Sequence, residues 1–166
     1  MKALLVLPLA IVVLMSCAKK ASPSGTSNAR NASYREKDIS IANMNSDIIN
    51  GVNDYRKSKG LPPFHLLAMA ASEAAKHSSD MASKKIPFGH AGFNQRAINI
   101  ANELHGTSAT GENVAYGKLT SKQVIDAWLK SPEHKANIEG NFYYTGVGVA
   151  KDSRGVIYYT QIFVKK

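Results

Sequence analysis

Two histidines and one glutamate lie in sequence surroundings that are unusual for surface residues. His90 lies between glycines in a segment typical of a loop, and His134 follows Pro132 at an expected helix start. Glu112 follows a glycine and leads into an apolar run. A carboxylate in that position is poorly placed for general solvation. We therefore expect Glu112 to point into a cleft or to bond a backbone amide.

These three side chains have the chemistry of either a metal site or a proton-transfer site. Two neutral imidazoles and one carboxylate match a catalytic zinc site that keeps one position open for water. His90, His134 and Glu112 are therefore candidate ligands of a divalent metal, with Zn²⁺ as the first choice. Without metal, the same candidate catalytic residues could supply a general base and its orienting carboxylate. The alternative is a hydrogen-bonded cluster that only pins loops over the sheet.

The N-terminus resembles a bacterial lipoprotein leader. Lys2 precedes an apolar run, Ala3–Met15, that is too short to span a membrane but fits a secretory signal. The only cysteine, Cys17, follows a small residue as in a lipobox. We expect residues 1–16 to be the signal peptide and Cys17 to carry lipid. The protein would then be anchored in the bacterial cell envelope outside the cytoplasm, on the periplasmic or the surface face.

The segment after the cysteine is expected to be a disordered basic linker. Residues 17–37 have almost no apolar bulk, so the folded domain should occupy residues 38–166. The chain has a net charge of +9, and five of its basic residues lie in this linker. Each would be attracted to anionic headgroups by about 1 kcal/mol near a membrane surface. A solvated spacer with incidental charge is the alternative, and nucleic acid is not an expected partner.

Hydrophobic periodicity predicts the elements that must position the candidate residues. Helical spacing predicts four helices: from Asn45 or Ser46 to Gly60, from Leu66 to about Ser83, over Arg96–Leu104, and from a cap at Ser121. Alternation predicts strands over 144–150 and 156–164 around a hairpin loop, and a third strand from Asn113. This order indicates an α+β class, built as a layered α-β-α domain.

Two further groups of residues have structural interpretations. His77 on the alanine-rich helix is expected to be partly exposed or at the edge of the core. Most aromatic residues are expected to pack in the core or on the sheet, with an aromatic-lined groove for a lipid or glycan as the functional alternative. These aromatic residues are Trp128, Phe142, Tyr143, Tyr144, Tyr158, Tyr159 and Phe163.

Several motifs together resemble the CAP superfamily of cysteine-rich secretory, antigen 5 and pathogenesis-related-1 proteins, in its bacterial SCP-like form. The resemblance covers about residues 47–164. The motifs occur in family order and are His77-Ser78-Ser79-Asp80-Met81-Ala82, Phe88-Gly89-His90, Gly111-Glu112-Asn113-Val114-Ala115, Trp128 followed by Ser131-Pro132-Glu133-His134-Lys135-Ala136-Asn137-Ile138, Gly146-Val147-Gly148-Val149-Ala150 and Tyr159-Thr160-Gln161-Ile162-Phe163.

The resemblance implies a three-layer α-β-α sandwich with a small antiparallel sheet and a central cleft. In the family, two histidines and two acidic residues line that cleft. His90, Glu112 and His134 match three of these positions, whereas the second acid falls near Ser131. Neighbouring Glu133 should not share the direction of His134, because adjacent residues on a helix point about 100° apart. Some family members bind a divalent metal at the two histidines.

Three classes of function remain at this point. The first is an envelope lipoprotein whose cleft binds a lipid, glycan or peptide, with or without a divalent metal. The second is a metal-dependent hydrolase, and the third is a structural or adhesion protein. The match lacks a second acid, and no serine or cysteine lies in a recognisable nucleophile elbow. Binding is therefore favoured over catalysis. The oligomeric state is not predicted.

Overall fold

The structure is a computed structural model that describes residues 39–107 and 109–166. The signal peptide, the lipidated Cys17 and the linker, predicted within residues 1–37, lie outside the described residues. Among the described residues, no helix is long and apolar enough to cross a membrane. The elements are α1 (Met44–Ser58), β1 (His65–Leu66), α2 (Ala68–Ala82), α3 (Phe93–Glu103), β2 (Ala109–Gly117), α4 (Ser121–Lys130), α5 (Pro132–Glu139), β3 (Tyr144–Lys151) and β4 (Ile157–Lys165).

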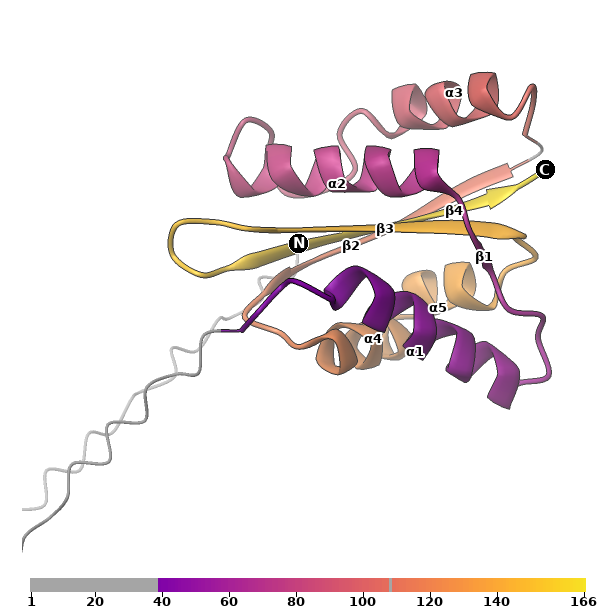
Figure 1. The fold of residues 1–166 in the computed structure, drawn as a ribbon, viewed down its shortest axis with the longest axis horizontal. Helices are drawn as coiled ribbons and strands as arrows, with labels where there is room; N and C mark the ends of the chain where they lie inside the picture. Colours follow the sequence, from indigo (N-terminus) through magenta and orange to yellow (C-terminus); the bar gives the residue numbers. More distant parts are fainter. Residues whose placement is uncertain (1–38, 108) are drawn as a thin grey trace, which may run out of the picture. The chain divides into compact units, whose positions relative to one another are not determined.

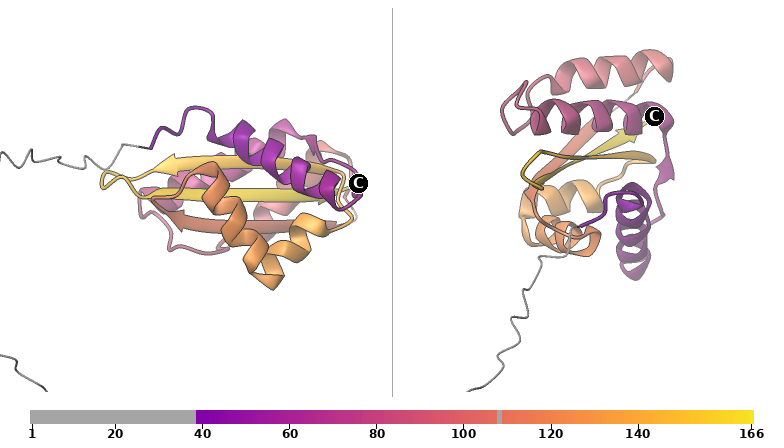
Figure 2. Two further views of the ribbon diagram at one scale, coloured as in Figure 1. Left: turned by 90° about the horizontal axis from the view of Figure 1, so that it is seen from below. Right: turned by 60° about the vertical axis from the view of Figure 1, so that its left-hand side comes forward.

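The four strands form one sheet that separates two layers of helices. The strand order is β1-β3-β4-β2, with β4 antiparallel to both of its neighbours and β1 parallel to β3. Helices α2 and α3 lie on one face, and α1, α4 and α5 lie on the other (Figures 1 and 2). The α+β class and the three-layer α-β-α sandwich predicted from the sequence are confirmed.

Two glycines on β3 let α2 pack directly on the sheet. A Cβ atom at Gly146 would lie 2.1 Å from the backbone nitrogen of Ala71, and one at Gly148 would lie 2.0 Å from that of Ala75. The alanine-rich face of α2 presents no bulk that would hold the two backbones apart. The sequence pattern Gly-Val-Gly on β3 therefore matches the alanines of α2, and it sets the height of this helix above the sheet.

The opposite face of the sheet carries the larger core. Val147 and Tyr159 point from β3 and β4 into a cluster with Ile48 of α1 and Trp128 of α4. Because side chains alternate along a strand, the neighbouring residues face α2 instead. For example, Ile162 packs with alanines of α2 and with Ile100 of α3 in a second, smaller cluster. All of β4 except its last residue is buried, as expected for a central strand.

The observed elements differ from the predicted ones in a few places. The predicted cap of α4 at Ser121 is wrong by one residue, because Thr120 is the N-cap and forms a capping box with Gln123. Strand β2 begins at Ala109, earlier than the predicted start, because it pairs with the full length of β4. The short strand β1 was not predicted. Tyr143, predicted as core, is 52% exposed.

Candidate functional site

Glu112 lies on β2 and is the buried centre of the candidate site. Its side chain is only 1% exposed and points toward the layer of α2 and α3. The guanidinium of Arg96 on α3 donates from Nε to Oε2 and from Nη2 to Oε1, each at 2.8 Å. This two-pronged geometry fits the planar fork of arginine, and it uses both oxygens of the carboxylate. Of the two predicted arrangements, a side chain that points into a cleft or one that bonds a backbone amide, the second is not observed among residues 39–107 and 109–166.

His90 lies in the loop between α2 and α3 and contacts the same carboxylate. Its Nδ1 is 2.9 Å from Oε1 of Glu112, while its ring remains 53% exposed. Because a carboxylate only accepts hydrogen bonds, Nδ1 carries the proton in this contact. When the ring is neutral, its lone pair lies on the opposite nitrogen, Nε2. The prediction that His90 and Glu112 lie together is consistent with this geometry.

His77 on α2 is a third histidine beside Glu112, and its predicted position is wrong. It is 2% exposed rather than at the core edge, because the short loop after α2 folds back over it. Its Nε2 lies 2.8 Å from the carbonyl oxygen of Gly89 and 4.0 Å from Oε1 of Glu112. Burial lowers the pKa of His77, so its ring is held neutral. The contact of His77 with the carbonyl of Gly89 therefore fixes the residue next to His90.

His134 approaches from the other side of the sheet. It lies in the first turn of α5, which begins at Pro132 as predicted. Asn113 of β2 donates to the carbonyl oxygen of His134 at 3.1 Å, and Asn137 donates to Oδ1 of Asn113 at 2.9 Å. These amides tie α5 to the edge strand. Glu133 is exposed and accepts a hydrogen bond from Ser131.

The two outer histidines thus straddle β2, which is an edge strand. Glu112 and Asn113 are adjacent and point to opposite faces of the sheet, so each secures one histidine-bearing segment. Burial lowers the pKa of His134, and the nearby His90 lowers it further. Both effects keep the ring of His134 neutral. We call the group of His90, Arg96, Glu112 and His134 the histidine site.

The predicted three-ligand metal set does not fit this arrangement. Both oxygens of Glu112 accept hydrogen bonds from Arg96, which competes with any metal for the carboxylate. Among residues 39–107 and 109–166, no group of three or more His, Cys, Asp or Glu is arranged to hold a metal ion. The imidazoles of His90 and His134 then remain as candidate metal ligands. Glu112 would act as a hydrogen-bonding partner of His90.

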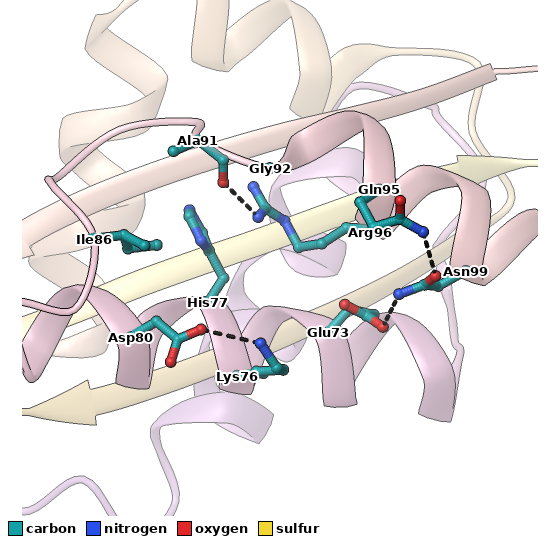
Figure 3. A pocket seen from close by; sticks show the side chains of 10 residues that line it. All are labelled: Glu73, Lys76, His77, Asp80, Ile86, Ala91, Gly92, Gln95, Arg96 and Asn99. Atoms are coloured by element: carbon teal, nitrogen blue, oxygen red, sulfur yellow. Dashed lines mark hydrogen bonds and ion pairs between the residues drawn. The ribbon is translucent and has the colours of Figure 1, made fainter.

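A pocket of about 300 Å³ lies directly behind the site, between α2 and α3. Figure 3 shows His77 and Arg96 pointing toward each other across it. Glu73 of α2 accepts a hydrogen bond from Asn99 of α3 on the pocket rim. His77 and Arg96 therefore form a wall that the pocket shares with the histidine site.

Arg96 and His77 are the site residues that sequence reasoning missed. Arg96 precedes the buried Ile100 by one helical turn, so it lies on the buried face of α3. An arginine on the apolar face of a predicted helix is the sequence signal that could have predicted a buried ion pair. His77 lies on the buried stripe of α2 in the same way, between Ala74 and Met81.

A three-layer α-β-α domain with paired histidines beside a buried glutamate defines a CAP domain. The profile of the CAP family, described as the cysteine-rich secretory protein family, matches residues 49–163. The chain therefore belongs to this family.

Three bacterial proteins illustrate the similarity. The uncharacterized protein YkwD of Bacillus subtilis is 30% identical over 130 residues, which cover 76% of this chain and 49% of YkwD. An extracellular protein of Bacillus anthracis that contains a SCP domain has 27% identity and a TM-score of 0.63, over 74% of this chain and 40% of that one. An outer surface protein of Borrelia burgdorferi has a TM-score of 0.67 at 18% identity, over 77% of this chain and 96% of that one, and so shares the fold. This chain spans about half the length of YkwD.

Proposed function

We propose that this protein is a ligand-binding module of the bacterial cell envelope and that the histidine site is its binding site. One observation carries the proposal: the carboxylate at the site, that of Glu112, is buried and fully paired with Arg96. Both oxygens of this carboxylate are held by N–H donors, so it orients His90 instead of contacting a ligand. The site thus offers two imidazoles on a rigid support, and the pKa of His134 is lowered by burial. This chemistry suits a small lipid, glycan or peptide ligand with hydrogen-bonding groups.

The location outside the cytoplasm is part of the same proposal. The sequence supports a secretory signal and a lipidated Cys17, and the related protein of Bacillus anthracis is described as extracellular. A lipid anchor followed by the basic linker would hold the domain at a membrane with anionic headgroups.

A metal-dependent hydrolase is the second candidate function, and the tautomer of His90 favours it. With Nδ1 bonded to Glu112, the Nε2 atom of His90 lies on the side of the ring away from the carboxylate, as in metal-binding histidines with a carboxylate partner. His90 and His134 would hold the metal, which would supply a Lewis acid and an activated water. Glu112 would keep His90 in its orientation.

The deciding experiment is a Zn²⁺ titration of the purified protein by calorimetry. Wild type is compared with a His90→Ala/His134→Ala variant and with His105→Ala, which removes an exposed histidine outside the site. Saturable binding that is lost only in the double variant would support the metal-dependent function, and hydrolysis assays with metal would follow. Absence of binding at millimolar Zn²⁺ would reject the hydrolase.

The binding function itself is tested with a panel of envelope lipids, glycans and peptides. The readout is the shift of the thermal midpoint in wild type and in the same variants. A ligand that stabilises wild type but not the double variant supports the proposal. If the double variant instead loses much of its stability and no panel member binds wild type, the histidines only pin loops, and the proposal fails.

A further inference from the structure

A second groove lies at the end of the sheet where β1 meets β3, away from the histidine site. Its volume is about 740 Å³, within the usual size range of ligand sites. It is lined by the segment Leu61–Pro63 before β1, by the aromatic segment before β3 and by the C-terminal lysines. None of its lining residues takes part in the proposed function.

Arg56, a buried arginine, lines this groove. The residue is 2% exposed, yet no carboxylate among the described residues pairs with it. Its Nε donates to the carbonyl of Pro62, and its Nη1 donates to those of Ile138 and Gly140. The guanidinium carbon also lies 3.7 Å from the ring centroid of Phe64. Within residues 39–107 and 109–166, Nη2 makes no hydrogen bond. A buried cation with one unbonded N–H group therefore forms part of the groove lining.

Exposed aromatic rings form the next part of the groove. The ring of Tyr143 is 4.5 Å from that of His65 and 4.7 Å from that of Tyr144, measured between centroids. Tyr143 is nevertheless 52% exposed, so this aromatic cluster offers uncovered ring surface. The faces of aromatic rings carry negative charge density and attract the weakly positive C–H groups of a ligand.

The charges of the lining favour an anion. Lys166 joins Arg56 on the positive side. The acidic side chain of the lining, Glu139, already accepts a hydrogen bond from Tyr55 at 2.6 Å and pairs with Lys135. Guanidinium groups bind carboxylates and phosphates through directed N–H bonds, so the unbonded Nη2 of Arg56 is a ready anchor.

We propose that this Arg56 groove binds an anionic glycan. A sugar ring would stack on Tyr143, and its acidic group would pair with Arg56 and Lys166. The lining favours a sugar over an acyl chain, because its aliphatic part is limited to Leu61 and two prolines. An acyl chain is bound in a tunnel of aliphatic side chains, whereas a sugar acid is bound by aromatic side chains that lie beside cationic ones.

The test is a calorimetric titration of the full-length protein with tetragalacturonate and with its methyl ester, which removes the charge and keeps the rings. We expect saturable binding of the acid and at least about tenfold weaker binding of the ester. Tyr143→Ala should weaken binding about tenfold, the loss of one good stacking contact. Tyr143→Phe keeps the ring and should retain binding. Tyr116→Ala, which removes another exposed tyrosine, is the matched control and should change nothing.

The charge contribution is tested with Lys166→Gln at low and high salt. This variant should bind more weakly at low salt and show less salt dependence than wild type. Lys130→Gln removes the same charge from α4 and should behave as wild type. Equal binding of the ester, equal loss in the control variant, or no binding of the acid would overturn the proposal. Binding to anionic phosphatidylglycerol vesicles that survives Tyr143→Ala, without glycan binding, would assign the groove to a membrane surface instead.

Discussion

At the scale of single residues, the ion pair of Arg96 and Glu112 decides what the histidine site can do. It joins α3 to β2 in a buried setting, with the two side chains 9% and 1% exposed. A buried pair of this kind adds little net stability over an apolar pair, but removal of one partner leaves an uncompensated charge. The pair therefore fixes the position of the carboxylate that His90 bonds.

Substitution of Arg96 should accordingly be costly. We expect Arg96→Met to lower the free energy of unfolding by about 3–5 kcal/mol, because Glu112 is left buried without its partner. Urea denaturation at neutral pH measures this loss. Arg96→Met combined with Glu112→Gln should recover part of it. A cost below about 1 kcal/mol for the single variant, the range of exposed pairs, would show that Glu112 does not depend on Arg96.

His77 should make stability depend on pH. Burial lowers its pKa below the ordinary value of about 6.5, so the unfolded chain takes up the proton more readily than the folded one. Stability is then complete above about pH 6.5 and falls as the pH drops toward the lowered pKa of the folded state. His134 has a pKa lowered in the same direction and adds to this effect.

Denaturation at several pH values between about 5 and 7.5 should show this decline (the range brackets the ordinary histidine pKa). His77→Gln keeps a donor for the carbonyl of Gly89 but cannot take up a proton in this range. Its stability should therefore fall less steeply than that of wild type. An unchanged slope would mean that His77 is not held neutral by burial.

At the scale of elements, the packing of α2 on β3 depends on the absence of side chains at Gly146 and Gly148. Gly148→Ala would place its Cβ about 2.0 Å from backbone atoms of α2, which cannot move aside locally. We expect a loss of about 1–3 kcal/mol or more in the free energy of unfolding, the range for overpacked cores. Thermal and urea denaturation measure it.

Gly51→Ala is the matched control for this prediction. The new Cβ in α1 would meet only the end of the Ile125 side chain, at 2.6 Å, and that side chain can rotate away. The helix also gains about 1 kcal/mol in propensity when glycine becomes alanine. The net effect should be small. Equal losses in Gly51→Ala and Gly148→Ala would contradict the view that backbone contact sets the position of α2.

The N-cap of α4 shows how precisely a local sequence pattern can predict where a helix begins. Thr120 and Ser121 are both good N-cap residues, and the sequence prediction chose the second. Gln123 stands three residues after Thr120, which is the spacing of a capping box. The signal for the correct cap was thus present in the sequence. The capping box, a purely local arrangement, distinguishes the two positions.

At the scale of the whole molecule, the proposed lipid anchor at Cys17 is separable from the domain. Cys17→Ala should move the protein from the membrane fraction to the soluble fraction of fractionated bacteria, because the linker alone binds headgroups only through screened charge. Immunoblotting of the two fractions measures the distribution. Thermal denaturation of the variant should match that of wild type. A variant that stays in the membrane fraction at high salt would contradict lipidation.

The sequence by itself determined the α+β class, the order of the helices and strands, and the motifs that identify the family. These features depend on local periodicity, on turn-forming residues and on motif order, all of which lie within short windows. The association of His90 with Glu112 was also predicted, through the family resemblance. The start of α5 at Pro132 followed from the fixed backbone angle of proline.

Only the tertiary structure decided what the candidate residues do. Arg96 and Glu112 are 16 residues apart, and they meet because α3 folds over the edge strand. The burial of His77, the unbonded Nη2 of Arg56 and the exposure of Tyr143 likewise depend on segments distant in sequence. Such contacts follow no local period, since packing of whole layers brings them together. For that reason the residue types indicated the chemistry available, and the packing determined which side chains are free to perform it.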